Sequence, residues 1–91
     1  MDRDSYGLIL APAARRALTH HLPDSAAFAA WELISGPLIE APRRVGTPLN
    51  PPSDGGWRAR RGEYQIRYEI DDADRTVRIL DIDHRCDAYR A

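Results

Sequence analysis

The spacing of apolar residues changes once along this chain, and that change restricts the fold more than any other feature. After a short first strand, apolar side chains recur three or four residues apart, as on a helix. From Trp57 onward they alternate with polar ones, which is typical of strands. The segment 42–56 between the two halves holds four prolines and three glycines. Helices followed by a run of strands predict an α+β fold.

The first half predicts one strand and an antiparallel pair of helices. Residues 5–10 form the strand, and Pro12 suits the first turn of the helix that follows. Pro23 ends that helix, Asp24 can cap the next one, and the Gly-Pro pair at 36–37 breaks or kinks it. The link between the helices is so short that they must form a hairpin. The apolar face of the second helix, expected in the core, consists of Ala27, Phe28, Trp31 and Ile34.

The second half predicts a three-stranded antiparallel meander. Its first strand begins at Trp57, its second covers 64–70, and its third covers 76–82 after a turn at 71–74. With the N-terminal strand this makes a four-stranded sheet in a single domain of residues 1–91. The helices cover one face of that sheet. The other face, which carries arginine and glutamine side chains, is expected to be the working surface.

Positive charge is concentrated in the middle of a nearly neutral chain. The net charge is −1, but residues 43–67 hold six arginines against two acids, and the segments on either side are net acidic. The chain has no lysine. Arginine binds phosphate with a planar fork, and aromatic rings can stack on bases. The arginine- and aromatic-rich segment 57–68 therefore predicts a nucleic-acid contact.

The sequence shows no sign of a disulfide, a membrane-spanning helix or a metal site. Cys86 is the only cysteine, so an internal disulfide is excluded and a reducing, cytoplasmic location is expected. No apolar run approaches the ~20 residues of a membrane span. His20-His21 has no second pair of residues at metal-ligand spacing, so neither a metal nor another cofactor is expected.

Five segments in order along the chain carry a family resemblance. They are Ala13-Ala14-Arg15-Arg16, residues 42–49, residues 57–64, residues 68–72, and residues 77–85 with Tyr89-Arg90 behind them. Together they resemble the RelE family of bacterial toxins, within the wider RelE/ParE superfamily. The resemblance implies a small α+β endoribonuclease (an mRNA interferase) that enters the ribosomal A site, cuts mRNA and so inhibits translation. It also implies a cognate, RelB-like antitoxin that binds the toxin in a hetero-oligomer.

The resemblance also assigns roles to individual residues. In the implied reaction the RNA 2′-OH attacks its own neighbouring phosphate, so neither a metal nor a covalent nucleophile is needed. The implied catalytic residues are Arg58, Arg60 and Arg85, which would hold and neutralise the phosphate, and Tyr89, which would stack on a base or aid proton transfer. The implied substrate-binding residues are Arg61, Gln65, Arg67 and His84.

One residue departs from the family pattern and leaves alternatives open. Members usually carry an arginine directly after the tyrosine of the strand 64–70, whereas this chain has Gln65 there, with Arg67 two residues on along the same face. One alternative is a ParE-like toxin that binds DNA gyrase and cleaves nothing. Another is a degenerate RelE-like protein that only binds its antitoxin. The sequence also leaves the general base unassigned, because arginine barely deprotonates.

Overall fold

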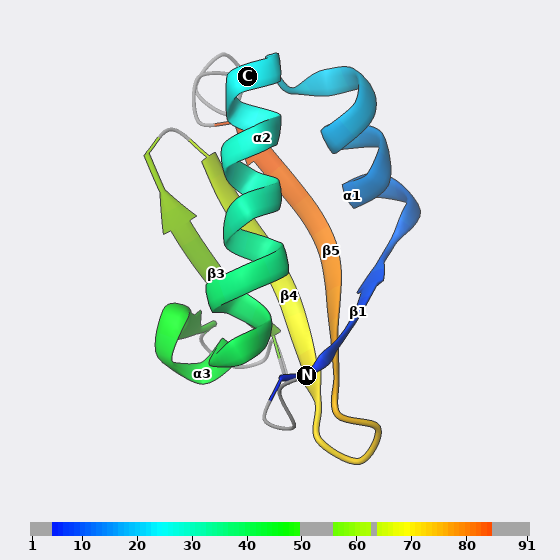
Figure 1. Cartoon of the computed structure of the whole chain (residues 1–91), viewed down its shortest axis with the longest axis vertical. Coiled ribbons are helices and arrows are strands. Elements are labelled where there is room, and N and C mark those ends of the chain that lie inside the picture. Colours follow the sequence, from blue (N-terminus) through cyan, green and yellow to red (C-terminus); the bar gives the residue numbers. More distant parts are fainter. Residues whose placement is uncertain (1–4, 50–55, 63, 85–91) are drawn as a thin grey trace.

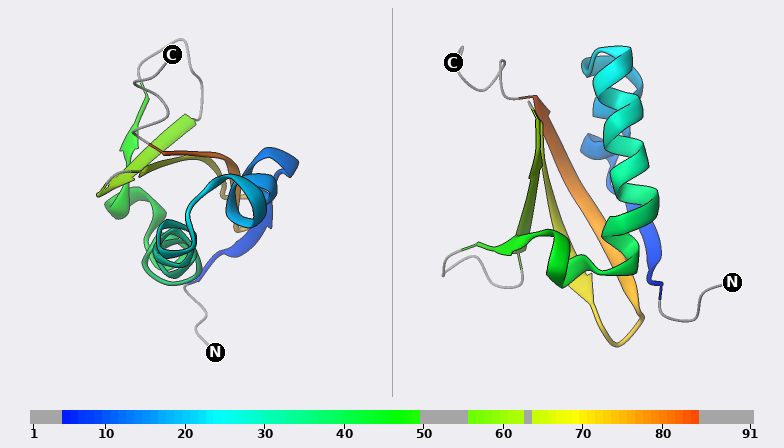
Figure 2. Two further views of the ribbon diagram at one scale, coloured as in Figure 1. Left: turned by 90° about the horizontal axis from the view of Figure 1, so that it is seen from above. Right: turned by 60° about the vertical axis from the view of Figure 1, so that its left-hand side comes forward.

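The computed structural model describes residues 5–49, 56–62 and 64–84. It has two layers, a twisted sheet and a helical layer over one face of it (Figures 1 and 2). The strands are β1 (Gly7–Leu10), β2 (Thr47–Pro48), β3 (Gly56–Arg61), β4 (Tyr64–Asp71) and β5 (Thr76–His84). The helices are α1 (Pro12–Arg16), α2 (Asp24–Leu33) and α3 (Pro42–Val45), with π-helical turns η1 (Ala17–His21) and η2 (Ile34–Leu38) after α1 and α2. The predicted α+β class and the helical layer on one face are confirmed.

The sheet has five described strands in the order β1-β5-β4-β3-β2, where four were predicted. The β3-β4-β5 meander is antiparallel as expected, and β1 lies parallel to β5. The additional strand is β2, in which Thr47 and Pro48 pair with Arg58 and Trp57. Two residues are too few to show the alternation of a strand, and one of them is proline, which usually argues against a strand. Proline is tolerated in β2 because it lies at the edge of the sheet, where its missing N–H is not needed for pairing.

The helical layer consists of two segments that run in opposite directions across the sheet (Figure 1). α1 continues directly into η1, and after Leu22-Pro23 the chain returns as α2 and η2. Of the predicted break or kink at Gly36-Pro37, the break does not occur. The helix instead widens into a π turn there. A π turn replaces the regular i→i−4 ladder, so it accommodates a proline that lacks an N–H.

The core lies between α2 and the central strands. The largest fully buried side chains are Ile34, Leu38, Ile66, Tyr68, Val77 and Ile79. The prediction that Phe28 and Trp31 are core residues is wrong, because they are 64% and 42% exposed. α2 faces the sheet with Ala30 and Leu33 instead. Phe28 precedes Ala30 by two residues, or about 200° around the helix, so its ring faces away from the sheet.

A buried tyrosine fixes the segment that leads into β2. Tyr68 of β4 is fully buried, and its hydroxyl donates a hydrogen bond of 2.6 Å to the backbone carbonyl of Pro42 in α3. Its ring is stacked against that of Trp57, with centroids 6.4 Å apart. A Cβ atom placed on Gly46 would lie 1.9 Å from the Tyr68 hydroxyl oxygen. Glycine at 46 therefore lets the backbone lie directly on Tyr68, which holds α3 and β2 against the edge of β3.

A polar cluster joins three segments at the opposite end of the sheet from the β3–β4 turn. Arg43 of α3 forms a two-pronged ion pair with Asp72 in the β4–β5 turn, with contacts of 2.5 and 3.2 Å. The hydroxyl of Tyr6, just before β1, donates to the same carboxylate at 3.0 Å. Hydrogen bonds from Arg43 and Tyr6 lower the pKa of Asp72. The Arg75 guanidinium lies 4.6 Å from the centre of the Tyr6 ring.

Candidate nucleic-acid interface

The face of the sheet opposite the helices carries three of the arginines that were singled out from the sequence, Arg58, Arg60 and Arg67. On β3 the exposed Arg58 and Arg60 flank Ala59, which is buried against the helical layer. On β4, Gln65 and Arg67 alternate with the buried Ile66 in the same way. The predicted alternation of these strands is confirmed. We call Arg58, Arg60, Gln65 and Arg67 the open-face patch.

The strand register brings these four residues together. Arg58 pairs with Arg67, and Arg60 pairs with Gln65, across the β3–β4 ladder. Directly paired residues of antiparallel strands have Cα atoms about 4.5–5.5 Å apart. Arg58 and Arg60 have no ion pair with any described residue. On the β3 side of the open-face patch, no carboxylate of a described residue therefore neutralises these two guanidinium groups.

Acidic residues of β5 border the patch on its other side. Asp81 pairs with Arg67 in register, and Asp83 pairs with Gln65. The Arg67 guanidinium donates to Asp81 at 2.8 Å. Asp81 was not among the residues singled out from the sequence, in which it and Arg78 interrupt a nearly continuous apolar strand.

The other candidate residues lie apart from the patch or outside the described residues. Arg61 ends β3 on the side that faces the helices, and it lines a shallow groove with Glu32 and Ser35 of the α2–η2 segment. His84 is the last residue of β5, where its backbone pairs with that of Tyr64. The predicted roles of Arg85 and Tyr89 fall outside the described residues, and the predicted roles of all eight candidates remain predictions.

Tyr64 begins β4 with its side chain on the core side. Burial raises the pKa of its hydroxyl, and the nearby positive charge of Arg61 offsets part of that rise. The hydroxyl oxygen is buried and has no hydrogen-bond partner among the described residues. Tyr64 therefore supports the turn between β3 and β4 by packing, and its hydroxyl does not reach the open face.

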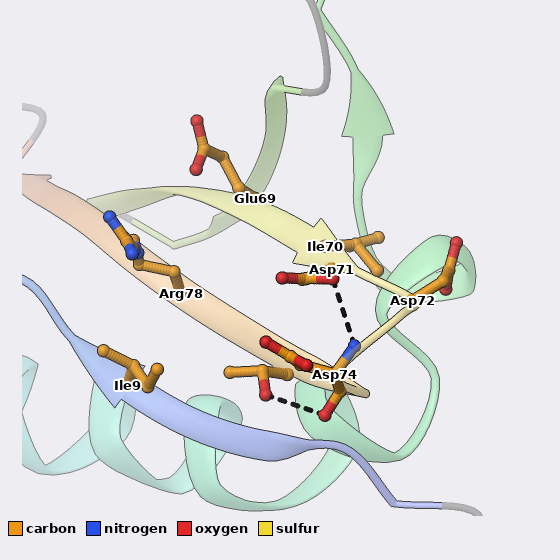
Figure 3. A pocket seen from close by; sticks show the side chains of 8 residues that line it. Ile9, Glu69, Ile70, Asp71, Asp72, Asp74 and Arg78 are labelled. Carbon is orange, nitrogen blue, oxygen red and sulfur yellow. Dashed lines mark hydrogen bonds between the residues drawn. The ribbon is translucent and has the colours of Figure 1, made fainter.

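The same side of the sheet has a second, acidic end at the β4–β5 turn. Figure 3 shows a pocket of about 440 Å³ there, lined by Ile9, Glu69, Ile70, Asp71, Asp72, Asp74, Thr76 and Arg78. Two of its carboxylates have local partners: Asp71 accepts a hydrogen bond from the backbone of Asp74, and Asp72 binds Arg43. Within residues 5–49, 56–62 and 64–84, no group of histidine, cysteine or carboxylate side chains is arranged to hold a metal ion. The described helices are also too short or too polar to cross a membrane.

Comparison with known proteins decides the family. Residues 8–89 match the family model described as the ParE toxin of the type II toxin–antitoxin system parDE. The chain is 48% identical to Toxin RelG of Mycobacterium tuberculosis over 77 residues, which cover 85% of this chain and 87% of the relative. It is 38% identical to Toxin RelE of the same organism, over 98% of this chain and 91% of the relative. The chain belongs to the RelE/ParE toxin superfamily.

Solved structures agree with this assignment. The toxin–antitoxin complex RelBE2 of M. tuberculosis contains a chain that superposes on this toxin with a TM-score of 0.84 and 43% identity, covering 89% of this chain and 99% of that one. A mutant of E. coli toxin RelE in the free state superposes with a TM-score of 0.62 and 16% identity, covering 94% of this chain and 88% of that one, which shows a shared fold. Toxin RelE and the RelBE2 chain, at 38% and 43% identity, identify this chain as a RelE-type toxin of type II toxin–antitoxin systems.

Proposed function

We propose that this toxin is an endoribonuclease that cuts mRNA in the ribosomal A site. The observation that carries the proposal is the open-face patch, in which Arg58 and Arg60 stand exposed and without ion pairs among the described residues. Exposed arginines that serve only as a solvated sheet face would be expected to pair with neighbouring carboxylates. Two neighbouring guanidinium groups that no described carboxylate pairs with instead suit a phosphate, which can accept hydrogen bonds from both.

The reaction that this surface can support needs positioning and charge stabilisation. The RNA 2′-oxygen attacks the adjacent phosphorus, the bond from phosphorus to the 5′-oxygen breaks, and a 2′,3′-cyclic phosphate and a free 5′-hydroxyl result. One proton leaves the 2′-hydroxyl and one reaches the departing 5′-oxygen. The phosphate gains negative charge on its free oxygens in the transition state, and Arg58 and Arg60 would stabilise it there together with Arg85.

Proton transfer has to come from a group other than these arginines. Arginine stays protonated in proteins, so Arg58 and Arg60 serve as cations and hydrogen-bond donors. His84 is the last residue of β5, and histidine is the side chain that enzymes use most often as a general acid or base. Tyr89 is the second candidate by resemblance to the family. We assign the proton-transfer step to these two C-terminal residues, with the ribosome as the setting that aligns the RNA.

We further propose that a RelB-like antitoxin binds and silences this toxin. The relative RelBE2, at 43% identity, was crystallised as a toxin–antitoxin complex. Acidic antitoxin side chains would bind the open-face patch and block access of RNA. An apolar antitoxin segment has a contact available on α2, where Phe28 and Trp31 are exposed one turn apart. Replacing Arg58 and Arg60 with glutamate should weaken the complex in a calorimetric titration, and unchanged affinity would exclude this docking mode.

The experiment that tests the proposed reaction is induced expression in a heterologous bacterium, followed by primer extension on a translated reporter mRNA. The wild type is run beside Arg60→Ala, Arg85→Ala and Gln65→Arg. Arg16→Ala serves as the matched control, because Arg16 is an exposed arginine on the helical layer. We expect cuts in phase with codons in the wild type and in the control, and loss of those cuts in Arg60→Ala and Arg85→Ala.

Other outcomes would support the alternatives. The matching family model is that of ParE, and a ParE-like toxin would arrest growth with intact mRNA and inhibit DNA gyrase in a supercoiling assay. A silent wild type whose activity is restored by Gln65→Arg would be a degenerate RelE-like protein. Cuts that persist in Arg60→Ala would refute the proposed role of the patch.

A further inference from the structure

The strongest contact at the open-face patch joins Arg67 to a carboxylate of the next strand. Arg67 Nη2 donates to Asp81 Oδ2 at 2.8 Å, and the side chains are 48% and 27% exposed. A guanidinium carries five N–H donors in a fixed plane. This ion pair occupies one nitrogen of Arg67, and no other side chain among the described residues forms a hydrogen bond or ion pair with the guanidinium.

A β-bulge places Asp81 opposite Arg67. Tyr68 pairs with Ile79, whereas the preceding residue of β4, Arg67, pairs with Asp81, so Leu80 is an extra residue on β5. Ile79 faces the core, and strict alternation would therefore turn Asp81 toward the core as well. The extra residue shifts the alternation, so Asp81 lies on the open face and Ile82 is buried.

The bulge produces a row of three charged side chains across the sheet, two positive and one negative. Arg58, Arg67 and Asp81 lie in register across β3, β4 and β5. Arg58 and Arg67 are like charges directly opposite each other, an arrangement that is unfavourable without a counter-charge. Asp81 supplies that counter-charge on the side of Arg67 away from Arg58, so Arg67 is drawn toward β5.

We propose that Asp81 is a positioning residue, which orients Arg67 so that its free edge binds the scissile phosphate together with Arg58. The inference rests on the proposed endoribonuclease function and deepens it. It also accounts for the departure at Gln65, because the cation that the family pattern supplies at that position comes here from Arg67, one row further along the same face. From position 67 the guanidinium has to reach the phosphate from one row further along the sheet. A long side chain that does so needs a fixed anchor to be oriented.

The test compares Asp81→Asn with Asp83→Asn in single-turnover cleavage of mRNA on programmed ribosomes. Both substitutions remove one negative charge from β5, but Asp83 pairs with Gln65 and has no ion pair with a described residue. We expect Asp81→Asn to lower the cleavage rate at saturating toxin roughly tenfold, with toxin affinity for the ribosome retained. Asp83→Asn should leave the rate nearly unchanged. In an Arg67→Gln background, Asp81→Asn should have no further effect, because its action passes through Arg67.

A second readout does not depend on cleavage. The Nε–Hε resonance of Arg67 is followed by NMR while a 2′-O-methyl RNA trinucleotide, which cannot react, is added. We expect the RNA to shift this resonance in the wild type and in Asp83→Asn, and to shift it far less in Asp81→Asn. If the wild type shows this behaviour but cleaves no mRNA, the proposed function fails and the positioning role stands.

Three results would overturn the inference. The first is faster cleavage or tighter RNA binding by Asp81→Asn, which would mean that Asp81 masks Arg67. The second is an equal loss of rate in the wild-type and Arg67→Gln backgrounds, which would mean a general structural role. The third is an Arg67 resonance that does not respond to RNA in the wild type.

Discussion

Substitution of Gly46 with alanine should destabilise this toxin far more than its exposure or backbone conformation indicates. Gly46 has φ −111°, which any residue adopts, so backbone strain plays no part. The new Cβ would lie 1.9 Å from the Tyr68 hydroxyl oxygen, 2.9 Å from Tyr68 Cζ and 3.0 Å from the Arg58 carbonyl oxygen. Tyr68 is fully buried and stacked on Trp57, so its ring has little room to move. The hydrogen bond from Tyr68 to Pro42 must therefore break.

The magnitude follows from these contacts. Leaving a buried hydrogen-bonding group unpaired costs about 1–3 kcal/mol. Overpacking a tight site costs about 1–3 kcal/mol more. The total of about 2–6 kcal/mol is a large part of the ~5–15 kcal/mol that stabilises a typical domain. For a domain of this size it corresponds to a fall in Tm of at least about 8 °C.

The assay is urea denaturation of the purified toxin, followed by circular dichroism and tryptophan fluorescence to establish two-state unfolding. Gly36→Ala is the matched control, because a Cβ on Gly36 meets no atom within 4 Å, and a helical alanine should be neutral or stabilising. Tyr68→Phe removes the clashing oxygen, so Gly46→Ala should cost less in that background than in the wild type. The reasoning would be refuted if Gly46→Ala lowered the free energy of unfolding by the same amount in the wild-type and Tyr68→Phe backgrounds, or by less than about 0.5 kcal/mol in the wild type.

Three further predictions concern pH, the core and the patch. Burial raises the pKa of Tyr68 to about 12, above the ~10 of an unfolded tyrosine. The contribution of Tyr68 to the free energy of unfolding should therefore be complete below pH 10 and decline as the pH rises toward 12. Thermal melts of the Tyr68→Phe variant should show a smaller decline over the same pH range. Trp31→Ser should change the free energy of unfolding by less than about 1 kcal/mol, whereas Leu33→Ala should cost about 2–5 kcal/mol in the same titration. Arg60→Ala should reduce the slope of log affinity against log salt for single-stranded RNA by about 0.7, and an unchanged slope would contradict a phosphate contact there.

The sequence was sufficient to predict the class of the fold and the face on which the patch lies. The switch to alternating apolar residues after Trp57 defined the meander, since only one register of β4 buries Ile66 and Tyr68 together. The same alternation placed Arg58 and Arg67 on the opposite face. Both results depend on the two-residue period of an extended strand, which β3 and β4 keep along the paired residues.

The incorrect predictions, for the buried face of α2 and for the number of strands, arose where the local sequence was compatible with more than one structure. α2 is rich in alanine and apolar on most sides, so its periodicity did not specify which stripe faces the sheet. The small side chain of Ala30 allows close approach to the strands, and this contact, which depends on the tertiary structure, turned Phe28 and Trp31 outward. The strand β2 was missed for a related reason, because its pairing is fixed by the contact of Gly46 with Tyr68 and not by a local pattern.

The β-bulge at Leu80 of β5 also could not be predicted from the sequence, and its effect on side-chain direction can be tested by deletion. Leu80 is the residue that the ladder skips, and it is not packed against the core cluster. Its deletion would leave Ile79, Asp81 and Ile82 in strict alternation, with Asp81 still opposite Arg67 and Ile82 still buried. We therefore expect the variant without Leu80 to fold, to lose no more than about 2 kcal/mol of stability, and to retain the RNA-dependent shift of the Arg67 resonance. A deletion variant that is unfolded would mean that the bulge shapes the whole sheet, whereas loss of the Arg67 shift in a folded variant would mean that the bulge itself aims the ion pair.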